Sequence, residues 1–188
     1  MRPEPPTDRG SLRIRDAVPA DAAACADIYA PFVVDSVVSL EESPPDATDM
    51  GRRIADVQRR HVWLVGEDAG GLVGYAYGTR FKERAAYRWA CEVSVYVASG
   101  HRRSGAGRAL YGALFDALAA LGYRRVIACM TDPNPPSAAL HGALGFSVVG
   151  TFREVAFKNG AWRDVTFFER GIGPSAQNPP PPLRRQSR

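Results

Sequence analysis

The sequence predicts one mixed α/β (α+β) domain in which helices flank a central mixed sheet. Two observations support this prediction. Apolar segments of strand length alternate along the chain with segments whose apolar residues recur at helical period. The chain also has 188 residues, of which 45% are hydrophobic, and this size and composition suit a single core. No internal repeat interrupts the alternation.

The first part of the chain is expected to hold three strands and two helices. Residues 12–15 suit a short strand, and residues 19–32 and about 46–60 have helical periodicity. Residues 62–67 and 72–78 are two apolar segments that flank DAGG, a turn sequence. These two segments are therefore predicted to form a hairpin.

A further strand, CEVSVYV at residues 91–97, leads to the strongest helical pattern of the chain. The stretch HRRSGAGRAL, residues 101–110, opens this helix. Apolar residues such as Leu110 and Leu114 follow at helical spacing, and Gly122 ends the pattern. We therefore expect a glycine-rich loop between a buried strand and a long amphipathic helix.

The last part of the domain is expected to contain a strand, a short helix and a long hairpin. RRVIACM, residues 124–130, is typical of a buried strand, and residues 137–144 suit a helix that ends at a glycine. Residues 147–170 then alternate as a closing hairpin that turns at Asn159 and Gly160. The domain is thus expected to span residues 11–172.

The two ends of the chain are expected to be disordered. Residues 1–10 form a leader without the apolar stretch of a secretory signal. Residues 173–188 are rich in proline and nearly free of apolar residues, and Pro179 to Pro182 favour a short polyproline II segment. Without a signal sequence, the expected location is the cytoplasm.

Charge and composition exclude several classes of protein. The tail carries three of the four net positive charges, so the domain is nearly neutral and does not resemble a nucleic-acid-binding protein. No apolar run approaches the roughly 20 residues of a membrane-spanning helix. Cys25, Cys91 and Cys129 are far apart, lack metal spacing and have apolar neighbours. We expect all three to be buried, with neither disulfides nor zinc.

The stretch HRRSGAGRAL predicts an anion-binding site. Backbone N–H groups at a helix N-terminus are unpaired and carry partial positive charge, and Gly105 and Gly107 allow a ligand to approach the backbone. The stretch lacks the GK[ST] of a Walker loop. Position 110 is Leu, where a dinucleotide fingerprint beginning at Gly105 would have its third glycine. On these residues alone, an ordinary glycine-containing loop remains an equal alternative.

The pattern RxxGxG between such a strand and such a helix resembles the pyrophosphate-binding loop of the GNAT acetyltransferases. The nearer resemblance is to the phosphinothricin acetyltransferase group of that superfamily, and it covers roughly residues 12–170. It includes KERAAYRW (82–89), EVSVYV (92–97), SAALHGALGF (137–146) and WRDV (162–165). It implies a single domain with about seven strands in a mixed sheet.

The resemblance implies acetyl-CoA as co-substrate and a set of residues that bind it. Val95, Tyr96 and Val97 would pair through their backbone with the pantetheine arm, as an added strand would, in a gap between strands 91–97 and 124–130. Asn134 would also bond to this arm. Backbone amides would hold the pyrophosphate at Arg103, Ser104, Gly105, Ala106, Gly107 and Arg108.

Acetyl transfer to an amine needs a base, because an alkylammonium with a pKa around 10 is almost wholly protonated at neutral pH. Strand alternation places Glu92 on one face with Ser94 and Tyr96. Such a glutamate is often merely solvated, but the resemblance makes Glu92 the catalytic base. His141 is the second catalytic candidate, as acid, base or positioning group. The oxyanion would be met by backbone N–H groups at a bulge near Val95.

No step of this chemistry needs a metal. His61 and His101 lack ligand partners at metal spacing and are expected at the surface. Among the acceptor-binding candidates, the resemblance assigns Lys82, Arg84 and Tyr87 to the acidic groups of a substrate. Leu40 stands where the family usually has an aromatic residue.

The expected function is therefore acetyl transfer from acetyl-CoA to the amine of a small amino acid. Phosphinothricin, methionine sulfoximine and methionine sulfone are the acceptors that the resemblance suggests. Another amine, such as a peptide N-terminus or a polyamine, and a non-catalytic acyl-CoA sensor remain as alternatives. The partners expected are thus small molecules, with no nucleic acid and no membrane, and the resemblance adds a homodimer.

Overall fold

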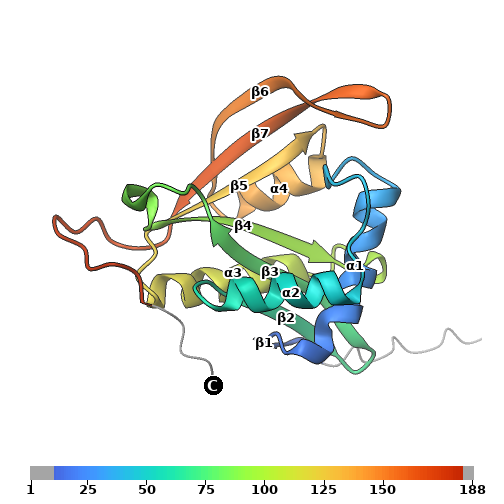
Figure 1. Ribbon diagram of the computed structural model, residues 1–188, viewed down its shortest axis with the longest axis horizontal. Coiled ribbons are helices and arrows are strands. Elements are labelled where there is room, and N and C mark those ends of the chain that lie inside the picture. Colours follow the sequence, from blue (N-terminus) through green and yellow to red (C-terminus); the bar gives the residue numbers. More distant parts are fainter. Residues whose placement is uncertain (1–10, 184–188) are drawn as a thin grey trace, which may run out of the picture.

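The computed structural model of the protein describes residues 11–183, and the expectations for residues 1–10 and 184–188 lie outside this range. The described chain forms a seven-stranded sheet in the order β1-β2-β3-β4-β5-β7-β6 (Figure 1). All neighbouring strands are antiparallel except β4 and β5, which are parallel. The predicted mixed sheet with flanking helices is confirmed.

The elements follow the order predicted from the sequence. The strands are β1 (Arg13–Asp16), β2 (Trp63–Asp68), β3 (Gly71–Arg80), β4 (Ala90–Val97), β5 (Arg125–Asp132), β6 (Ser147–Lys158) and β7 (Ala161–Gly171). The α-helices are α1 (Ala22–Val34), α2 (Ala47–Gln58), α3 (Ala106–Ala120) and α4 (Pro135–Ala143). Short 3₁₀ turns occur at Pro19–Asp21, Ala85–Tyr87 and Ser99–His101.

Two apolar clusters lie on opposite faces of the sheet because side chains alternate along each strand. One cluster joins α1 and α2 to residues such as Trp63, Val65 and Tyr75. The other joins α3 to Cys91 and Val93, with parts of α4 packed around it. The sheet is therefore the middle layer, and its two faces have different neighbours.

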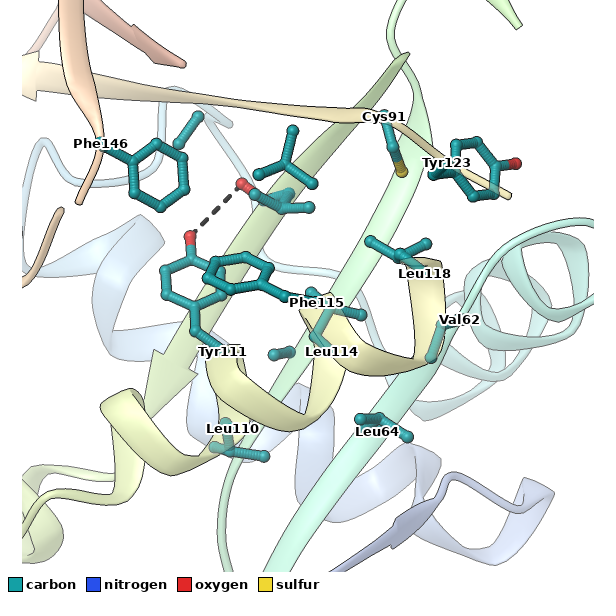
Figure 2. Packing of buried hydrophobic residues seen from close by; sticks show 14 of the residues in the cluster. Val62, Leu64, Cys91, Leu110, Tyr111, Leu114, Phe115, Leu118, Tyr123 and Phe146 are labelled. Atoms are coloured by element: carbon teal, nitrogen blue, oxygen red, sulfur yellow. Dashed lines mark hydrogen bonds between the residues drawn. The ribbon is translucent and has the colours of Figure 1, made fainter. Parts of the chain in front are cut away.

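Helix α3 supplies the centre of the second cluster. In Figure 2 its residues Leu110, Tyr111, Leu114 and Leu118 point toward the sheet and pack among the strands. The Tyr111 hydroxyl also donates a hydrogen bond of 3.4 Å to the Val93 carbonyl (Figure 2). These contacts hold the N-terminus of α3 at a fixed place beside β4.

The closing hairpin turns where the sequence predicted. Asn159 and Gly160 have φ angles of 52° and 72°, as a two-residue hairpin turn of type I′ requires. Next to the turn, the buried Lys158 ammonium donates to the carbonyls of Val33 and Ser39, both at 2.7 Å. The tip of the hairpin is thereby fixed to the end of α1 and to the loop that follows it.

The segment after β7 lies against the domain, on the same side as residues 81–89 (left in Figure 1). The Trp89 indole N–H donates to the Pro180 carbonyl at 2.8 Å, and the Leu183 amide donates to the Leu121 carbonyl at 2.8 Å. Disorder of residues 173–188 in solution stays a prediction, and these are the contacts that the described part of the segment makes. No helix in residues 11–183 is long and apolar enough to cross a membrane.

Candidate active site

The chain passes from β4 into α3 through two residues with left-handed backbone. Arg103 has a φ of 63° and Gly105 a φ of 90°, an angle that favours glycine. The Ser104 hydroxyl donates to the His101 carbonyl at 2.7 Å and accepts from the Ala106 amide at 3.3 Å. Because the first amides of a helix have no partner within it, the loop presents N–H donors at the C-terminal end of β4. This geometry suits an anion.

Three arginines surround this loop, and two of them have defined partners. The Arg102 guanidinium lies over the Phe32 ring at 5.4 Å from the ring centre. Arg108 donates to the Ala143 carbonyl at 3.3 Å, which ties the first turn of α3 to the end of α4. Arg103 is exposed. The loop is therefore held in place on both sides while its own cations face solvent.

Strands β4 and β5 pair only where they begin. The last rung of their ladder joins Glu92 to Ile127. Beyond it, Val95, Tyr96 and Val97 have a strand partner only on the β3 side within the described chain. The gap expected between these two strands is therefore present, and it leads from Glu92 toward the loop before α3.

The expected bulge near Val95 is wrong. Pairing between β3 and β4 runs without a shift from Gly74 opposite Val97 to Arg80 opposite Cys91. Continuous hydrogen bonding to β3 keeps β4 regular, so the separation comes from β5 turning away. Backbone groups on the β5 side of β4 are thus left for another partner without any bulge.

Glu92 lies at the point where the gap opens. Its neighbours Cys91 and Val93 are buried in the α3 cluster, so Glu92 points to the opposite face, toward α1 and α2. The side chain is half-buried. Across the gap, the Cys129 thiol donates to Glu92 Oε1 at 3.6 Å. The Glu92 carboxylate can therefore reach a ligand in the gap from the face of the sheet that α1 and α2 cover.

The expectation that all three cysteines are buried is correct for Cys25 and Cys91 and wrong for Cys129. Cys129 lies on β5 beyond the last rung to β4, so it has a strand partner only on the β7 side, and it is exposed. Its poorly hydrated surroundings, and then the charge of Glu92, raise the pKa of the thiol to about 12. The thiol thus stays protonated at neutral pH and acts as a hydrogen-bond donor.

His141 lies on the other face of the sheet, in an aromatic pocket. Only 3% of the residue is exposed, and its ring stacks on Phe168 at 4.8 Å between ring centres. Phe146 and Tyr111 pack at 5.0 and 5.9 Å. Burial lowers the pKa of His141 to about 4, so the imidazole is neutral at neutral pH.

One nitrogen of His141 has a partner and the other does not. Nδ1 lies 3.4 Å from the Ser137 hydroxyl. Nε2 is buried and makes no hydrogen bond to the described residues. An unpaired buried polar atom is costly, so each one in a native protein calls for an explanation. Among residues 11–183, therefore, only Nδ1 of this imidazole has a hydrogen-bond partner.

Asn134 begins the helix that carries His141. Its side-chain oxygen accepts from the Ser137 amide at 3.3 Å, so the residue is the N-cap of α4. Ser137 in turn contacts His141. Asn134 therefore positions the helix that carries His141.

The candidate acceptor residues lie in the connection between β3 and β4. Lys82, Arg84 and Tyr87 are all exposed, and Tyr87 packs edge-on against Phe81 at 5.9 Å. Lys82 and Arg84 line a cavity of about 370 Å³ together with residues of the C-terminal segment. Tyr87 is not among the residues that line it. The three residues are close in sequence, but only Lys82 and Arg84 line the same cavity.

A polar network above the Glu92 face was missed by sequence reasoning. Arg53 of α2 donates to both oxygens of Glu41 at 2.7 and 2.9 Å, and Tyr29 of α1 donates to the same carboxylate at 2.9 Å. The bonds from Arg53 hold the pKa of Glu41 below its usual range. Glu41 follows Leu40 in the loop between the helices, and no spacing in the sequence links it to Arg53. The network fixes this loop over the sheet.

His61 and His101 were expected at the surface, and the structure shows each of them half-buried and with a partner. His61 Nδ1 lies 2.7 Å from the Tyr123 hydroxyl, and His101 Nε2 lies 3.1 Å from Asp68 Oδ2. Burial, and then the charges of Arg80 and Arg60, lower the pKa of His61 to about 4. Within residues 11–183, no group of three or more potential ligand side chains could hold a metal ion.

Comparison with proteins of known function shows relatives over nearly the whole chain. The phosphinothricin N-acetyltransferase of Streptomyces viridochromogenes is 38% identical over 177 residues, which cover 94% of this chain and 96% of that protein. An L-methionine sulfoximine/L-methionine sulfone acetyltransferase of Salmonella typhimurium is 32% identical over 84% of this chain and 93% of its own length.

Comparison with solved structures agrees. A GNAT superfamily phosphinothricin acetyltransferase from Sinorhizobium meliloti, crystallised with acetyl-CoA, superposes with a TM-score of 0.85 at 34% identity. The match covers 94% of this chain and 99% of that one. The family model of the acetyltransferase (GNAT) domain matches residues 14–167. With its splayed strands, its loop before α3 and these relatives, the chain belongs to the GNAT acetyltransferases.

Proposed function

We propose that the protein transfers an acetyl group from acetyl-CoA to the amine of a small amino acid, with phosphinothricin, methionine sulfoximine and methionine sulfone as the acceptors to test first. The observation that carries this proposal is the position of Glu92 at the opening between β4 and β5. The names of the relatives supply the acceptors, since they are phosphinothricin and methionine sulfoximine or sulfone acetyltransferases.

The chain offers features that fit acetyl-CoA. The N–H groups of residues 103–108 suit its pyrophosphate, and the free edge at Val95, Tyr96 and Val97 suits its amide-containing arm. The unpaired Nε2 of His141 is a third feature that fits a ligand in the gap. When bound, acetyl-CoA supplies an acetyl thioester. Asn134 supports this site by capping α4.

Glu92 is the proposed general base. An acceptor amine enters as an ammonium group, and its nitrogen can attack only after losing a proton. The Glu92 carboxylate lies on the face toward α1 and α2, so it can accept that proton while the amine faces the gap. The exposed Cys129 thiol donates to one carboxylate oxygen and leaves the other for the acceptor.

His141 is the proposed hydrogen-bond donor on the opposite side of the gap. Because burial lowers its pKa to about 4, it does not serve as a stored imidazolium at neutral pH. When the Ser137 hydroxyl donates to Nδ1, Nε2 carries the ring hydrogen and can donate it to a ligand. Charge that develops on the leaving sulfur would be stabilised in this way.

Lys82, Arg84 and Tyr87 are the proposed contacts for the acidic groups of the acceptor. A guanidinium can bond two oxygens of a carboxylate or phosphinate at once, and an ammonium adds charge without fixed direction. Tyr87 is 43% exposed, which leaves its hydroxyl accessible from the same connection.

A homodimer is part of the proposal, and the exposed face of the closing hairpin supports it. Six large apolar side chains on β6 and β7 are each more than half exposed: Val148, Val149, Phe152, Val155, Phe157 and Trp162. Monomers rarely expose so many large apolar side chains on one hairpin, and β6 is an edge strand. We expect light scattering to give twice the mass of the chain. Phe152→Lys should shift the measured mass toward that of a single chain.

The cytoplasm is the proposed location. All three cysteines are free, and Cys25 and Cys91 are buried without partners for a disulfide. Free thiols are maintained in reducing compartments. Export of an epitope-tagged protein to an oxidising compartment of its own host would contradict this proposal.

A panel of acceptors tests the function. Purified protein with acetyl-CoA should release free thiol with at least one of the three amino acids, far above the rate without acceptor. Polyamines and short peptides in the same panel distinguish the proposal from an enzyme for another amine. Absence of thiol release with every acceptor, despite tight acetyl-CoA binding, would indicate a non-catalytic sensor.

A further inference from the structure

The lysine at the tip of the closing hairpin is buried, and the proposed function leaves it without a role. Only 6% of Lys158 is exposed. Its ammonium donates to the carbonyls of Val33 and Ser39, which lie 125 and 119 residues earlier in the chain, both at 2.7 Å. Figure 1 shows the hairpin tip beside the loop that joins α1 to α2. A buried ammonium is costly unless it is hydrogen-bonded, so Lys158 holds both partners firmly.

The first partner lies at the C-terminal end of α1. The carbonyl of Val33 is among the last four of the helix, which have no partner within it. These carbonyls carry partial negative charge, so a cation beside them is stabilising. Lys158 therefore fixes the end of α1, where the loop of residues 35–46 begins.

The second partner, Ser39, uses all of its polar groups. Its amide donates to the Phe32 carbonyl at 3.3 Å, and its carbonyl accepts from Lys158. Its hydroxyl accepts from the Glu41 amide at 3.1 Å and lies 2.6 Å from the Tyr29 hydroxyl. Only 4% of Ser39 is exposed. The middle of the loop is therefore held at one buried point, to which Lys158 contributes the bond from the hairpin.

The loop that Lys158 holds lies on the same face of the sheet as Glu92. Tyr29 contacts Ser39 through its hydroxyl, and its ring packs edge-on against Tyr96 at 4.8 Å between ring centres. Tyr96 packs against the apolar cluster of α1 and α2. It follows Glu92 by four residues on β4, so the two side chains share a face.

The loop also approaches the sheet closer to the proposed base. Ser94 follows Glu92 by two residues, about 7 Å along the strand in the direction of the gap. Its partner on β3 is Tyr77. Burial is the main cause that raises the pKa of Tyr77 to about 12, and the nearby charge of Glu41 adds to it. A small amino acid spans a similar length, so an acceptor with its amine at Glu92 can reach the loop.

We propose that Lys158 is a positioning residue for the acceptor site, because it holds the loop of residues 35–46 against an acceptor bound at Glu92. This inference rests on the proposed transfer to a small amino acid. Leu40, in the middle of the loop, is 39% exposed and forms an apolar wall of that site. Loss of the ammonium removes the donor from two carbonyls and releases the loop. The edge of β4 and the loop before α3 are left as they were.

Two variants remove bonds that hold the loop, and a third is the control. Lys158→Met keeps the length of the side chain and loses the ammonium. Tyr29→Phe loses the hydroxyl from the same network and keeps the ring. The control, Arg153→Gln, also removes one positive charge from β6, but its partner Asp164 lies within the hairpin. Circular dichroism and thermal melting establish that each variant is folded.

Calorimetric titration with phosphinothricin in the presence of CoA measures acceptor binding without turnover. We expect Kd to rise about tenfold in Lys158→Met and about threefold in Tyr29→Phe, with no change in Arg153→Gln. In thiol-release assays, KM for the acceptor should rise in the same order. KM for acetyl-CoA should stay constant, and kcat should change by less than about twofold. Hydrogen exchange in residues 35–46 should be faster in the first two variants only.

A double variant shows whether the two residues act through the same loop. If they do, Lys158→Met and Tyr29→Phe together should raise Kd by less than the product of their separate effects. Lys158→Met combined with Arg153→Gln should raise Kd no further than Lys158→Met alone. A full product of effects in the first pair would mean that Lys158 does not act through this loop.

The outcomes separate this inference from the proposed function. An unchanged Kd in Lys158→Met would overturn the positioning role, as would equal rises in KM for both substrates. If Lys158→Met does not fold, Tyr29→Phe decides, and unchanged Kd and hydrogen exchange there would overturn it. Failure of the wild type to bind any of the three proposed acceptors would do the same. Binding that depends on Lys158, without any thiol release, would sustain the positioning role and overturn the proposed transfer.

Discussion

The two faces of the sheet place their candidate catalytic residues in different environments. Glu92 is half-buried on the face toward α1 and α2, next to an exposed thiol. His141 is 3% exposed on the α3 side, within a pocket of aromatic rings. The two residues lie on opposite faces of the sheet and differ in their access to water.

This difference suits Glu92 to the proposed role of proton acceptor and His141 to the proposed role of fixed hydrogen-bond donor. A base must meet an incoming ammonium group and later pass its proton to solvent, which an accessible carboxylate can do. A buried neutral imidazole exchanges protons poorly with solvent but offers a rigid N–H in a poorly hydrated place. A histidine at a candidate site is therefore not an acid–base catalyst by its location alone.

The largest effect expected is that of Glu92→Gln. Loss of the carboxylate removes the proton acceptor, and we expect kcat to fall by about 10²- to 10⁴-fold. Affinity for acetyl-CoA should be unchanged, because the loop before α3 and the edge of β4 remain. Steady-state kinetics with thiol detection and calorimetry with acetyl-CoA measure the two quantities.

Glu169→Gln is the matched control. Glu169 stands opposite Ile127, which stands opposite Glu92, so the three residues form one row across the sheet. Its carboxylate pairs with Arg125 at the surface. We expect its loss to change kcat by less than about twofold. Full turnover in Glu92→Gln at neutral pH would contradict the assignment of the base.

The fold could be predicted from the sequence because its signals are local. The alternation of CEVSVYV, the helical spacing after HRRSGAGRAL and the Asn159–Gly160 turn each act within a few residues. The separation of β4 from β5 depends on residues far apart in the sequence, and only the family resemblance predicted it. The bulge near Val95 came from the same source and was wrong, because β4 stays paired to β3 throughout.

The environment of the candidate site was less predictable than its residues. Cys129 sits in the apolar sequence RRVIACM, which favours burial, yet it lies beyond the last rung to β4 and is exposed. Burial of His141 depends on Phe146 and Phe168, which come from other elements. The Glu41–Arg53 pair joins a loop to a helix. Such contacts across elements leave no period in the sequence.

The stability of the protein should depend on pH through the buried imidazole. The unfolded chain binds a proton at His141 near pH 6.5, whereas the folded chain binds it only near pH 4. Stability is therefore complete above about pH 6.5 and decreases as pH falls toward 4. His141 should account for about 3 kcal/mol of this loss. The buried neutral His61, with a pKa of about 4, should act in the same direction.

His141→Phe isolates this contribution because it keeps a flat ring among the aromatic neighbours and cannot titrate. Urea unfolding at pH 7.0, 6.0 and 5.0 should show a smaller loss of stability in the variant than in the wild type. Parallel pH profiles for the two proteins would mean that His141 is not buried and neutral as described. The difference between the profiles is informative, since carboxylates affect both proteins alike.

The same variant should also slow turnover, by about tenfold, if Nε2 donates to a ligand in the gap. Loss of a donor from a neutral group should leave the shape of the pH–rate profile unchanged between pH 6 and 8. Disappearance of a limb of that profile in His141→Phe would instead assign acid–base titration to His141, and the contrast between the two faces would fail.

The smallest effect expected is that of Cys129→Ala. This variant tests the more accessible face of the sheet, on which Glu92 and Cys129 lie. The thiol donates a single weak bond of 3.6 Å to Glu92 Oε1. Its removal should change kcat by only about two- to threefold, because the Glu92 carboxylate can reach the acceptor without this weak bond. Cys129→Ser keeps a donor and should restore most of the rate. If both variants lost turnover as fully as Glu92→Gln, the thiol would contribute to the reaction itself, and the open face would contain two reactive groups.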